Sequence, residues 1–305
     1  MQTDAIGVLG GSGLYELNGL LELREIPVTT PWGEPSAPPV EGRFAGRRVV
    51  FMPRHGRGHR LLPSEINYRA NICALKQLGV AQVISISAVG SMREEIQPGD
   101  FVLADQFIDR TVLRASTFFG GGCVGHVSFA DPVCADLVGA VARGAEQAGF
   151  APRRAGALEE AVGGVRPRLV HIGGTYVCME GPQFSTRAES LLHRSWNAAV
   201  IGMTGATEAK LCREAELCFA LVALATDYDC WHTEEQSVTA GMVLQMLRDN
   251  IAAAKEMLTK TLPGLPTDRR CGCMRAAEHA LLTAPDAIAP AARARLQELY
   301  GRKIG

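Results

Sequence analysis

The feature that most constrains this chain is the uninterrupted apolar run Phe219–Ala225. Seven consecutive apolar residues have the length of a strand buried on both faces, and such strands lie in the middle of α/β sheets. Two carboxylates, Asp227 and Asp229, follow the run almost directly. Ligands of open α/β folds bind beyond the carboxyl ends of the strands, which makes this pair a candidate functional site. The alternative is that both aspartates are turn residues or cap a helix.

Three other expected strands end in glycine-rich or polar turns: Gly10–Gly13 with Ser12, Arg54–His59 with His55, and Ser87–Ser91. Glycines let backbone N–H groups converge on an anion, and hydroxyl and guanidinium groups add donors, so these turns predict a phosphate or oxyanion site. The first turn is not a dinucleotide fingerprint, because Glu16 holds the third glycine position. A plain tight turn and a solvated basic loop are the alternatives.

Regular elements follow one another without repeats or a linker before about Pro263. We expect strands within 5–14 and at 47–53, 82–91, 101–104, 170–179, 199–203 and 219–225. We expect helices at 64–79, capped by Ser64, and at 135–149, 186–193, 204–216, 238–262, 276–282 and 291–300. The economical arrangement is a single α/β domain over residues 1–262, with a helical extension over 263–305 packing on it.

Composition narrows the class of function. With 305 residues, 47% of them apolar, the chain can bury a large core. A net charge of −1 and the absence of a long basic run argue against nucleic acid as a partner. No basic segment precedes the first apolar run and no run approaches ~18 residues, so we expect no signal peptide, no membrane span and a cytoplasmic location.

Nine cysteines is a high count, and a buried free thiol is the expectation for Cys73, Cys123, Cys178 and Cys230. Cys271 and Cys273 form a C-x-C pair, for which metal ligation, a strained disulfide and chance all stay open. Metal binding has little support from the sequence, because no second Cys/His pair lies at zinc-finger spacing.

An ordered set of motifs resembles the trimeric class of purine nucleoside phosphorylases, most closely its 5′-methylthioadenosine phosphorylase branch. The motifs are Ile6–Gly13, Arg54–Arg57, Ser87–Ser91, Glu180–Ser185 and Ala225–Trp231, and the resemblance covers roughly residues 5 to 262. It implies a single domain with a mixed, barrel-like central sheet flanked by helices, and active sites near the subunit interfaces of a trimer.

The implied reaction is phosphorolysis, in which phosphate displaces the purine at C1′ of the nucleoside. In this branch the products are adenine and 5-methylthio-α-D-ribose 1-phosphate, with a role in purine and methionine salvage. Phosphate is a co-substrate, and no metal or organic cofactor is needed. Phosphate-binding residues carried over by the resemblance are Ser12, Arg54, His55, Ser87, Ala88 and Thr204.

The purine must leave with a proton at N7, and the resemblance makes Asp227 the donor, supported by Asp229. A buried carboxylate beside a second one is expected to have a raised pKa. In oxopurine-specific relatives a glutamate and an asparagine stand at the positions of Ser185 and Asp227. A carboxylate accepts from an exocyclic amine, so this pair favours adenine.

Further contacts are implied for the rest of the nucleoside. Phe184 stacks near the base, Met203 packs against the ribose, and His126 from a neighbouring subunit lines the 5′ pocket with Val243 and Leu244. The residues Gly205 and Ala206 depart from the eukaryotic pattern and keep a methylthioinosine substrate open. The same fold could instead carry out phosphorolysis of adenosine, inosine or guanosine. A nucleoside hydrolase and a non-catalytic binding protein also stay open as functions.

The C-x-C pair also resembles thermophilic archaeal members, in which such cysteines form disulfides and trimers pair into hexamers. Candidate partners of Cys271 and Cys273 are Cys134, Cys212 and Cys218, with a connectivity that the sequence does not define. A homotrimer or a dimer of trimers is therefore expected.

Overall fold

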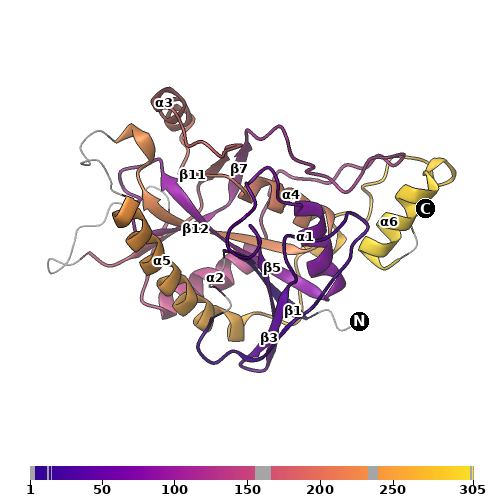
Figure 1. Cartoon of the computed structure of the whole chain (residues 1–305), viewed down its shortest axis with the longest axis horizontal. Helices are drawn as coiled ribbons and strands as arrows, with labels where there is room; N and C mark the ends of the chain where they lie inside the picture. Colours follow the sequence, from indigo (N-terminus) through magenta and orange to yellow (C-terminus); the bar gives the residue numbers. More distant parts are fainter. Residues whose placement is uncertain are drawn as a thin grey trace.

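The computed structural model describes residues 4–11, 14, 16–154, 166–232, 240–302 and 304. It confirms an α/β fold in which one large mixed sheet lies between helices (Figure 1). The strands are β1 (Ala5–Gly10), β2 (Leu21–Glu25), β3 (Val40–Phe44), β4 (Arg47–Pro53), β5 (Val80–Ser91), β6 (Phe101–Ala104), β7 (Gln106–Asp109), β8 (Ala151–Arg154), β9 (Leu169–Ile172), β10 (Thr175–Cys178), β11 (Val200–Gly202) and β12 (Cys218–Asp227).

The helices surround this sheet on both of its faces. They are α1 (Tyr68–Gln77), α2 (Ala135–Gln147), α3 (Arg187–Ser195), α4 (Gly205–Glu214), α5 (Ala240–Thr261) and α6 (Pro290–Tyr300), with 3₁₀ turns η1 (Asp229–Trp231), η2 (Leu262–Gly264), η3 (Gly272–Arg275) and η4 (Pro285–Ala287). No described helix is long and apolar enough to cross a lipid bilayer.

The sheet is both open and barrel-like. Its long path runs β2-β3-β4-β1-β5-β12-β6-β9-β8, and β5 also pairs with β11, which pairs with β10, which pairs with β7. Because Asp105 alone separates β6 from β7, the path β5-β12-β6-β7-β10-β11 returns to β5 and closes. The expected barrel-like sheet is confirmed, and β5 and β12 belong to both of its parts.

The expected central strand is confirmed as β12, whose side chains alternate between two core clusters. Leu221 and Ala223 face a cluster built with α1 and α4, whereas Ala220 and Val222 face a cluster built with α2 and α5. A strand covered by helices on both faces has no polar side, which explains the continuous apolar run in the sequence.

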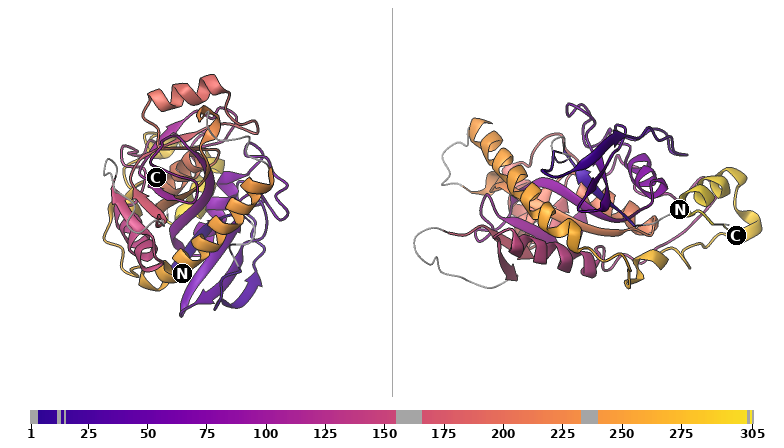
Figure 2. Two further views of the ribbon diagram at one scale, coloured as in Figure 1. Left: turned by 90° about the vertical axis from the view of Figure 1, so that its left-hand side faces the viewer. Right: turned by 90° about the horizontal axis from the view of Figure 1, so that it is seen from below.

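The segment after α5 contributes to both clusters. Leu265 and Cys273 pack with α2 and α5, whereas Ile288, Leu296 and Ile304 pack with α1 and α4. Figure 2 shows this segment running from the end of α5 along the domain to α6. The boundary at residue 262 stays a prediction.

Three expected elements are wrong in detail. The helix expected at 64–79 begins only at Tyr68, because the Asn67 side chain, rather than Ser64, caps it by accepting from the Ala70 N–H at 3.1 Å. The strand expected at 170–179 is split by Gly173 and Gly174, whose φ angles of 91° and 126° turn the chain between β9 and β10.

The helix expected at 276–282 is also absent. The 3₁₀ turn η3 precedes this stretch, and Leu281 forms an isolated antiparallel bridge with Gly125. The His126 N–H donates to the Ala280 carbonyl at 2.8 Å, so backbone groups there pair with a distant loop.

Candidate active site

A cavity of about 590 Å³ lies at the carboxyl ends of the parallel strands β4, β1, β5 and β12. This is the position at which α/β sheets bind ligands. Sequence-predicted residues that line it are Arg54, His55, Ser87, Ala88, Phe184, Met203, Thr204, Asp227 and Asp229. Segments far apart in the sequence therefore meet in one site, although the role of each residue stays a prediction.

One end of the cavity contains an unsatisfied donor at a helix N-terminus. Thr204 is the N-cap residue of α4, and its side chain makes no capping hydrogen bond. The hydroxyl is buried and has no hydrogen-bond partner among the described residues. Because a buried polar group without a partner is destabilising and a helix N-terminus attracts negative charge, this end is suited to an anion.

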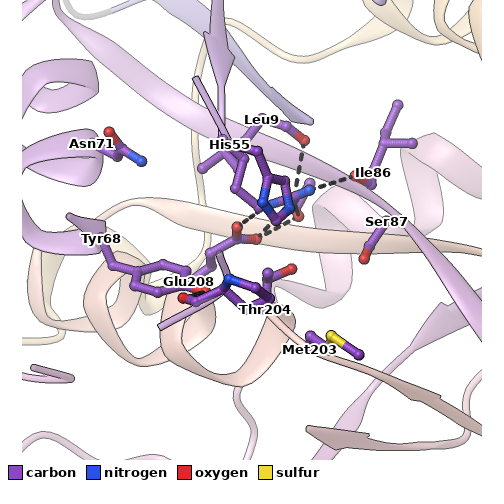
Figure 3. A network of polar contacts seen from close by, with 12 residues as sticks. Leu9, His55, Tyr68, Asn71, Ile86, Ser87, Met203, Thr204 and Glu208 are labelled. Carbon is purple, nitrogen blue, oxygen red and sulfur yellow. Dashed lines mark hydrogen bonds and ion pairs between the residues drawn. The ribbon is translucent and has the colours of Figure 1, made fainter. Parts of the chain in front are cut away.

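Arg54 forms an ion pair with Glu208, a residue that the sequence reasoning missed. Figure 3 shows Glu208 with Thr204, whose carbonyl accepts from the Glu208 backbone N–H. The Arg54 Nε donates to one Glu208 carboxylate oxygen, and its Nη2 donates to the other at 3.2 Å and to the Ser85 hydroxyl at 2.8 Å. Burial alone would lower the pKa of Arg54, but the neighbouring Glu208 carboxylate raises it above its ordinary value.

Glu208 therefore fixes the direction of the guanidinium and balances its charge. Both side chains are almost completely buried, with exposed fractions of 4% and 1%. The available signal was the position of Glu208 in the first turn of α4, the helix that begins directly after Thr204.

His55 is held as a neutral imidazole. Its Nδ1 lies 2.9 Å from the Leu61 carbonyl oxygen. Since a carbonyl only accepts, Nδ1 carries the proton and Nε2 is left as an acceptor. Burial lowers the pKa of His55 to about 4, with Arg54 and His59 adding to the shift, and the ring stacks on His59 with centroids 4.2 Å apart. Near neutral pH this histidine is an acceptor for a protonated oxygen.

The two aspartates line the same cavity at the end of β12. Asp227 accepts from the Asp229 backbone N–H at 2.8 Å and from the Thr226 hydroxyl at 2.7 Å. Asp229 accepts from the Ser190 hydroxyl at 2.6 Å. Burial raises the pKa of Asp229, and the charge of Asp227 adds to the effect.

Gly90 allows β5 to approach these carboxylates. A Cβ at this position would lie 3.2 Å from both the Asp227 Oδ1 and the Asp229 Cβ. Asp229 itself has φ = 51°, a left-handed conformation that aspartate tolerates better than most residues and that directs its side chain toward Ser190. The aspartates are therefore positioned by their backbone.

The two residues expected to contact the base, Phe184 and Ser185, differ in their position relative to the cavity. Phe184 lines the cavity but is 82% exposed in the single chain. Ser185 is not among the lining residues; its hydroxyl lies 3.9 Å from the Met179 sulfur and beside Asp229, and its carbonyl accepts from the Cys230 thiol. The contact of Ser185 with the base stays a prediction.

Four further expected residues lie elsewhere or outside the described part of the chain. His126 borders a separate hollow with Phe119 and Glu214, and its role in the site of a neighbouring subunit stays a prediction. Ser12 and the side chains of Val243 and Leu244 lie outside the described residues. On the same helix α5, Leu247 and Ile251 line the cavity; the sequence reasoning missed them, although the helical periodicity from Val243 indicates both positions.

The cysteine expectations need correction. All nine cysteines lie in the described part of the chain and are free thiols, so none of the possible disulfides is formed. Cys73, Cys123 and Cys178 are buried free thiols as expected, and Cys230 is a partly exposed one. The sulfurs of Cys134, Cys218, Cys271 and Cys273 all lie within 4.8 Å of one another. Cys212 is not with them, because it packs in the core cluster on the other face of β12.

Comparison with known proteins identifies the family to which this cavity belongs. Residues 5–263 match the family model of the phosphorylase superfamily. The chain belongs to this superfamily. An S-methyl-5′-thioadenosine phosphorylase of Geobacter sulfurreducens is 51% identical over 98% of this chain and 99% of its own, and one of Koribacter versatilis is 49% identical over 98% and 97%.

Solved structures agree with the superfamily fold. A methylthioadenosine phosphorylase from an Antarctic soil metagenomic library superposes with a TM-score of 0.88 at 42% identity, over 98% of this chain and 99% of that one. The methylthioadenosine phosphorylase of Schistosoma mansoni in complex with adenine superposes with a TM-score of 0.80 at 35% identity, over 90% and 96%. The family resemblance carried by the sequence motifs is confirmed.

Proposed function

We infer that this chain catalyses the phosphorolysis of S-methyl-5′-thioadenosine to adenine and 5-methylthio-α-D-ribose 1-phosphate. The observation that carries the proposal is the single cavity in which the unpartnered Thr204 hydroxyl and Arg54 are brought together with the Asp227–Asp229 pair. A displacement at C1′ needs a bound anionic nucleophile on one side and a proton donor to the leaving base on the other. The two relatives that are 51% and 49% identical to this chain are named for this reaction.

Phosphate binds at the N-terminus of α4. The Thr204 hydroxyl and the helix N–H groups donate to its oxygens, and the neutral His55 accepts from its remaining O–H. Ser87 and Ala88 of β5 border the same space. Because Glu208 holds the Arg54 guanidinium in place, the anion is oriented toward C1′ by groups that need no rearrangement.

The purine leaves toward the aspartates. Asp227 passes a proton to N7, and Asp229, whose raised pKa favours the protonated form, supplies the second carboxyl group through which that proton is shared. The same carboxylates accept from the exocyclic amine of adenine. An inosine-type base offers a carbonyl at this position and would leave the acceptor unpaired.

The methylthio group at the 5′ position of the substrate is apolar. Leu14, Leu62, Leu247 and Ile251 line the cavity, and this lining suits a methylthio group better than a hydroxyl. No cofactor is required for a displacement in which phosphate is itself the co-substrate. We propose that the enzyme is cytoplasmic and serves purine and methionine salvage.

The single chain leaves the base side of the cavity uncovered. Phe184 is 82% exposed, and Val112 and Leu113 expose 82% and 73% of their surface. Exposed large apolar side chains of this kind favour burial by another subunit. We therefore propose a trimer or a dimer of trimers in which the His126 of one subunit completes the site of the next.

The deciding experiment measures adenine release from S-methyl-5′-thioadenosine with and without phosphate, with methylthioinosine as the competing substrate. Strict dependence on phosphate and preference for the 6-amino base are expected. Release without phosphate would make the enzyme a hydrolase. Preference for methylthioinosine would overturn the assignment of adenine as the base. The variant Asp227→Asn, compared with the surface control Asp286→Asn, tests the role of the Asp227 carboxylate directly.

A further inference from the structure

Four cysteines from three separate segments converge at the end of β12 that lies away from the active site. Cys134 is the N-cap residue of α2, Cys218 begins β12, and Cys271 and Cys273 flank the start of η3. Their four sulfur atoms lie within 4.8 Å of one another. Three of the four side chains are buried and Cys271 is partly exposed.

The arrangement has the dimensions of a tetrahedral thiolate site. With metal–sulfur bonds of about 2.3 Å, the sulfurs around a zinc ion lie about 3.8 Å apart. The Cys218 and Cys271 sulfurs are 3.3 Å apart, which is close to this edge and far from the about 2.05 Å of a disulfide bond. Small shifts of side chains would therefore suffice to bring all four sulfurs to one ion.

The chemistry of the donors selects the metal. An all-cysteine set of soft ligands in tetrahedral positions suits zinc and excludes hard cations such as magnesium and calcium. Four protein ligands also leave no open coordination position, which is characteristic of structural rather than catalytic zinc.

The surroundings compensate the charge of such a centre. Zinc with four thiolates carries a net charge of about −2. The Arg269 guanidinium lies 4.0 Å from the Cys218 sulfur and is held by the Ala81 carbonyl at 3.0 Å. Cys134 stands at the positive N-terminus of α2, where a thiolate is stabilised. Cys134, Cys218 and Cys271 also border a surface hollow through which an ion could enter.

We propose that Cys134, Cys218, Cys271 and Cys273 bind one zinc ion as four thiolates. Binding releases the four thiol protons and forms four zinc–sulfur bonds without any change of oxidation state. The site fastens the segment after α5 to both α2 and β12. It is structural, because Cys218 and Asp227 lie at opposite ends of β12, about 30 Å apart at the usual rise of a strand.

The test begins with the metal content of the full-length protein, purified under reducing conditions without chelators. We expect inductively coupled plasma mass spectrometry to find about one zinc per chain. Titration of the thiolates with a mercurial reagent should release this zinc in proportion to the thiolates that have reacted. The variant Cys273→Ser should lose the zinc. The matched control Cys212→Ser, also a buried cysteine, should keep it.

A second measurement covers the case in which the ligand variant fails to fold. Cobalt added to metal-depleted wild-type protein should give the intense visible bands of a tetrahedral site and the charge-transfer band of cobalt–thiolate bonds. Stoichiometric zinc with these bands supports the proposal. Protein without metal, or chains whose mass shows disulfides between these cysteines, overturns it, as does iron in place of zinc.

Discussion

Glu208 offers the sharpest test of how the phosphate end of the cavity is built. Replacing Glu208 by Gln keeps the shape and one acceptor but removes the charge that balances Arg54. Removing one partner of a buried ion pair typically costs about 3–5 kcal/mol, because the remaining charge has neither water nor a counter-ion. The side chains of Arg54 and Glu208 are 4% and 1% exposed, so this cost applies to them as a buried ion pair. For a chain of this size the loss corresponds to a melting temperature lower by roughly 6–10 °C.

Phosphate should restore part of this stability. In the Glu208→Gln variant the uncompensated guanidinium attracts the dianion more strongly, so added phosphate should raise the melting temperature more than it does in the wild-type protein. For comparison, a ligand at 100 times its Kd stabilises by about 2.7 kcal/mol. Thermal unfolding over a phosphate titration measures both effects together.

Two controls make the interpretation specific. Glu214→Gln alters another buried carboxylate of α4, one that accepts from the Thr117 hydroxyl and the Phe118 N–H. It should lower stability by about 1 kcal/mol and leave the phosphate effect unchanged. Replacing both Arg54 and Glu208 by Met should recover most of the stability and abolish the phosphate effect. A Glu208→Gln variant as stable as the wild type, or with an unaltered response to phosphate, would refute the reasoning.

Three further outcomes follow from the site and the barrel. Thr204→Val should raise the KM for phosphate by about 10–100-fold, which is the range expected for the loss of one hydrogen bond to a charged group, with little change in stability. Initial rates at varied phosphate concentration measure this KM, and an unchanged KM contradicts the prediction. Since the folded-state pKa of His55, about 4, lies below its ordinary value of 6.5, the neutral ring stabilises the fold above pH 6.5, and this contribution is lost as the pH falls toward 4. In urea unfolding without phosphate, the free energy of unfolding should therefore fall less steeply with decreasing pH in His55→Gln than in the wild type. Identical slopes in the two proteins would exclude His55 as a source of this pH dependence. Gly202→Ala places a methyl group against the Tyr176 hydroxyl and should lower stability by about 1–3 kcal/mol, whereas Gly264→Ala, whose new Cβ meets open space, should not.

The sequence predicted those parts of the site that depend on a single segment. The run Phe219–Ala225 identified the central strand because a strand covered on both faces must be apolar throughout. Arg54 and His55 were predicted because they directly follow a strand and lie in one basic, glycine-containing motif, whereas Thr204 was carried over by the family resemblance. In these cases the position of the residue directly after a strand already places its side chain at the carboxyl end of the sheet.

What the sequence could not predict depends on contacts between distant segments. The pairing of Arg54 with Glu208 joins residues 154 positions apart, and the start of α1 is fixed by Asn67, whose amide also donates to the Trp32 carbonyl. The cysteine cluster was not visible, because zinc-finger spacing presumes ligands close in sequence. Here a strand and a helix N-terminus from elsewhere in the chain complete the set.

The closed path through β5 and β12 has a mechanical consequence for the enzyme. Ser87 and Ala88 on β5 border the anion end, and Asp227 at the end of β12 forms the base end, yet the two strands are hydrogen-bonded neighbours along most of their length. Among the described residues of β5 and β12, no hinge separates Ser87 and Ala88 from Asp227, so under the proposed mechanism the separation of nucleophile and leaving group is set when the chain folds rather than when the substrate arrives. The entropy of ordering these groups is then lost in folding, and binding can proceed with little movement of the backbone. Substrates should accordingly be distinguished by whether they span a fixed distance, and much less by how far they can induce the enzyme to close.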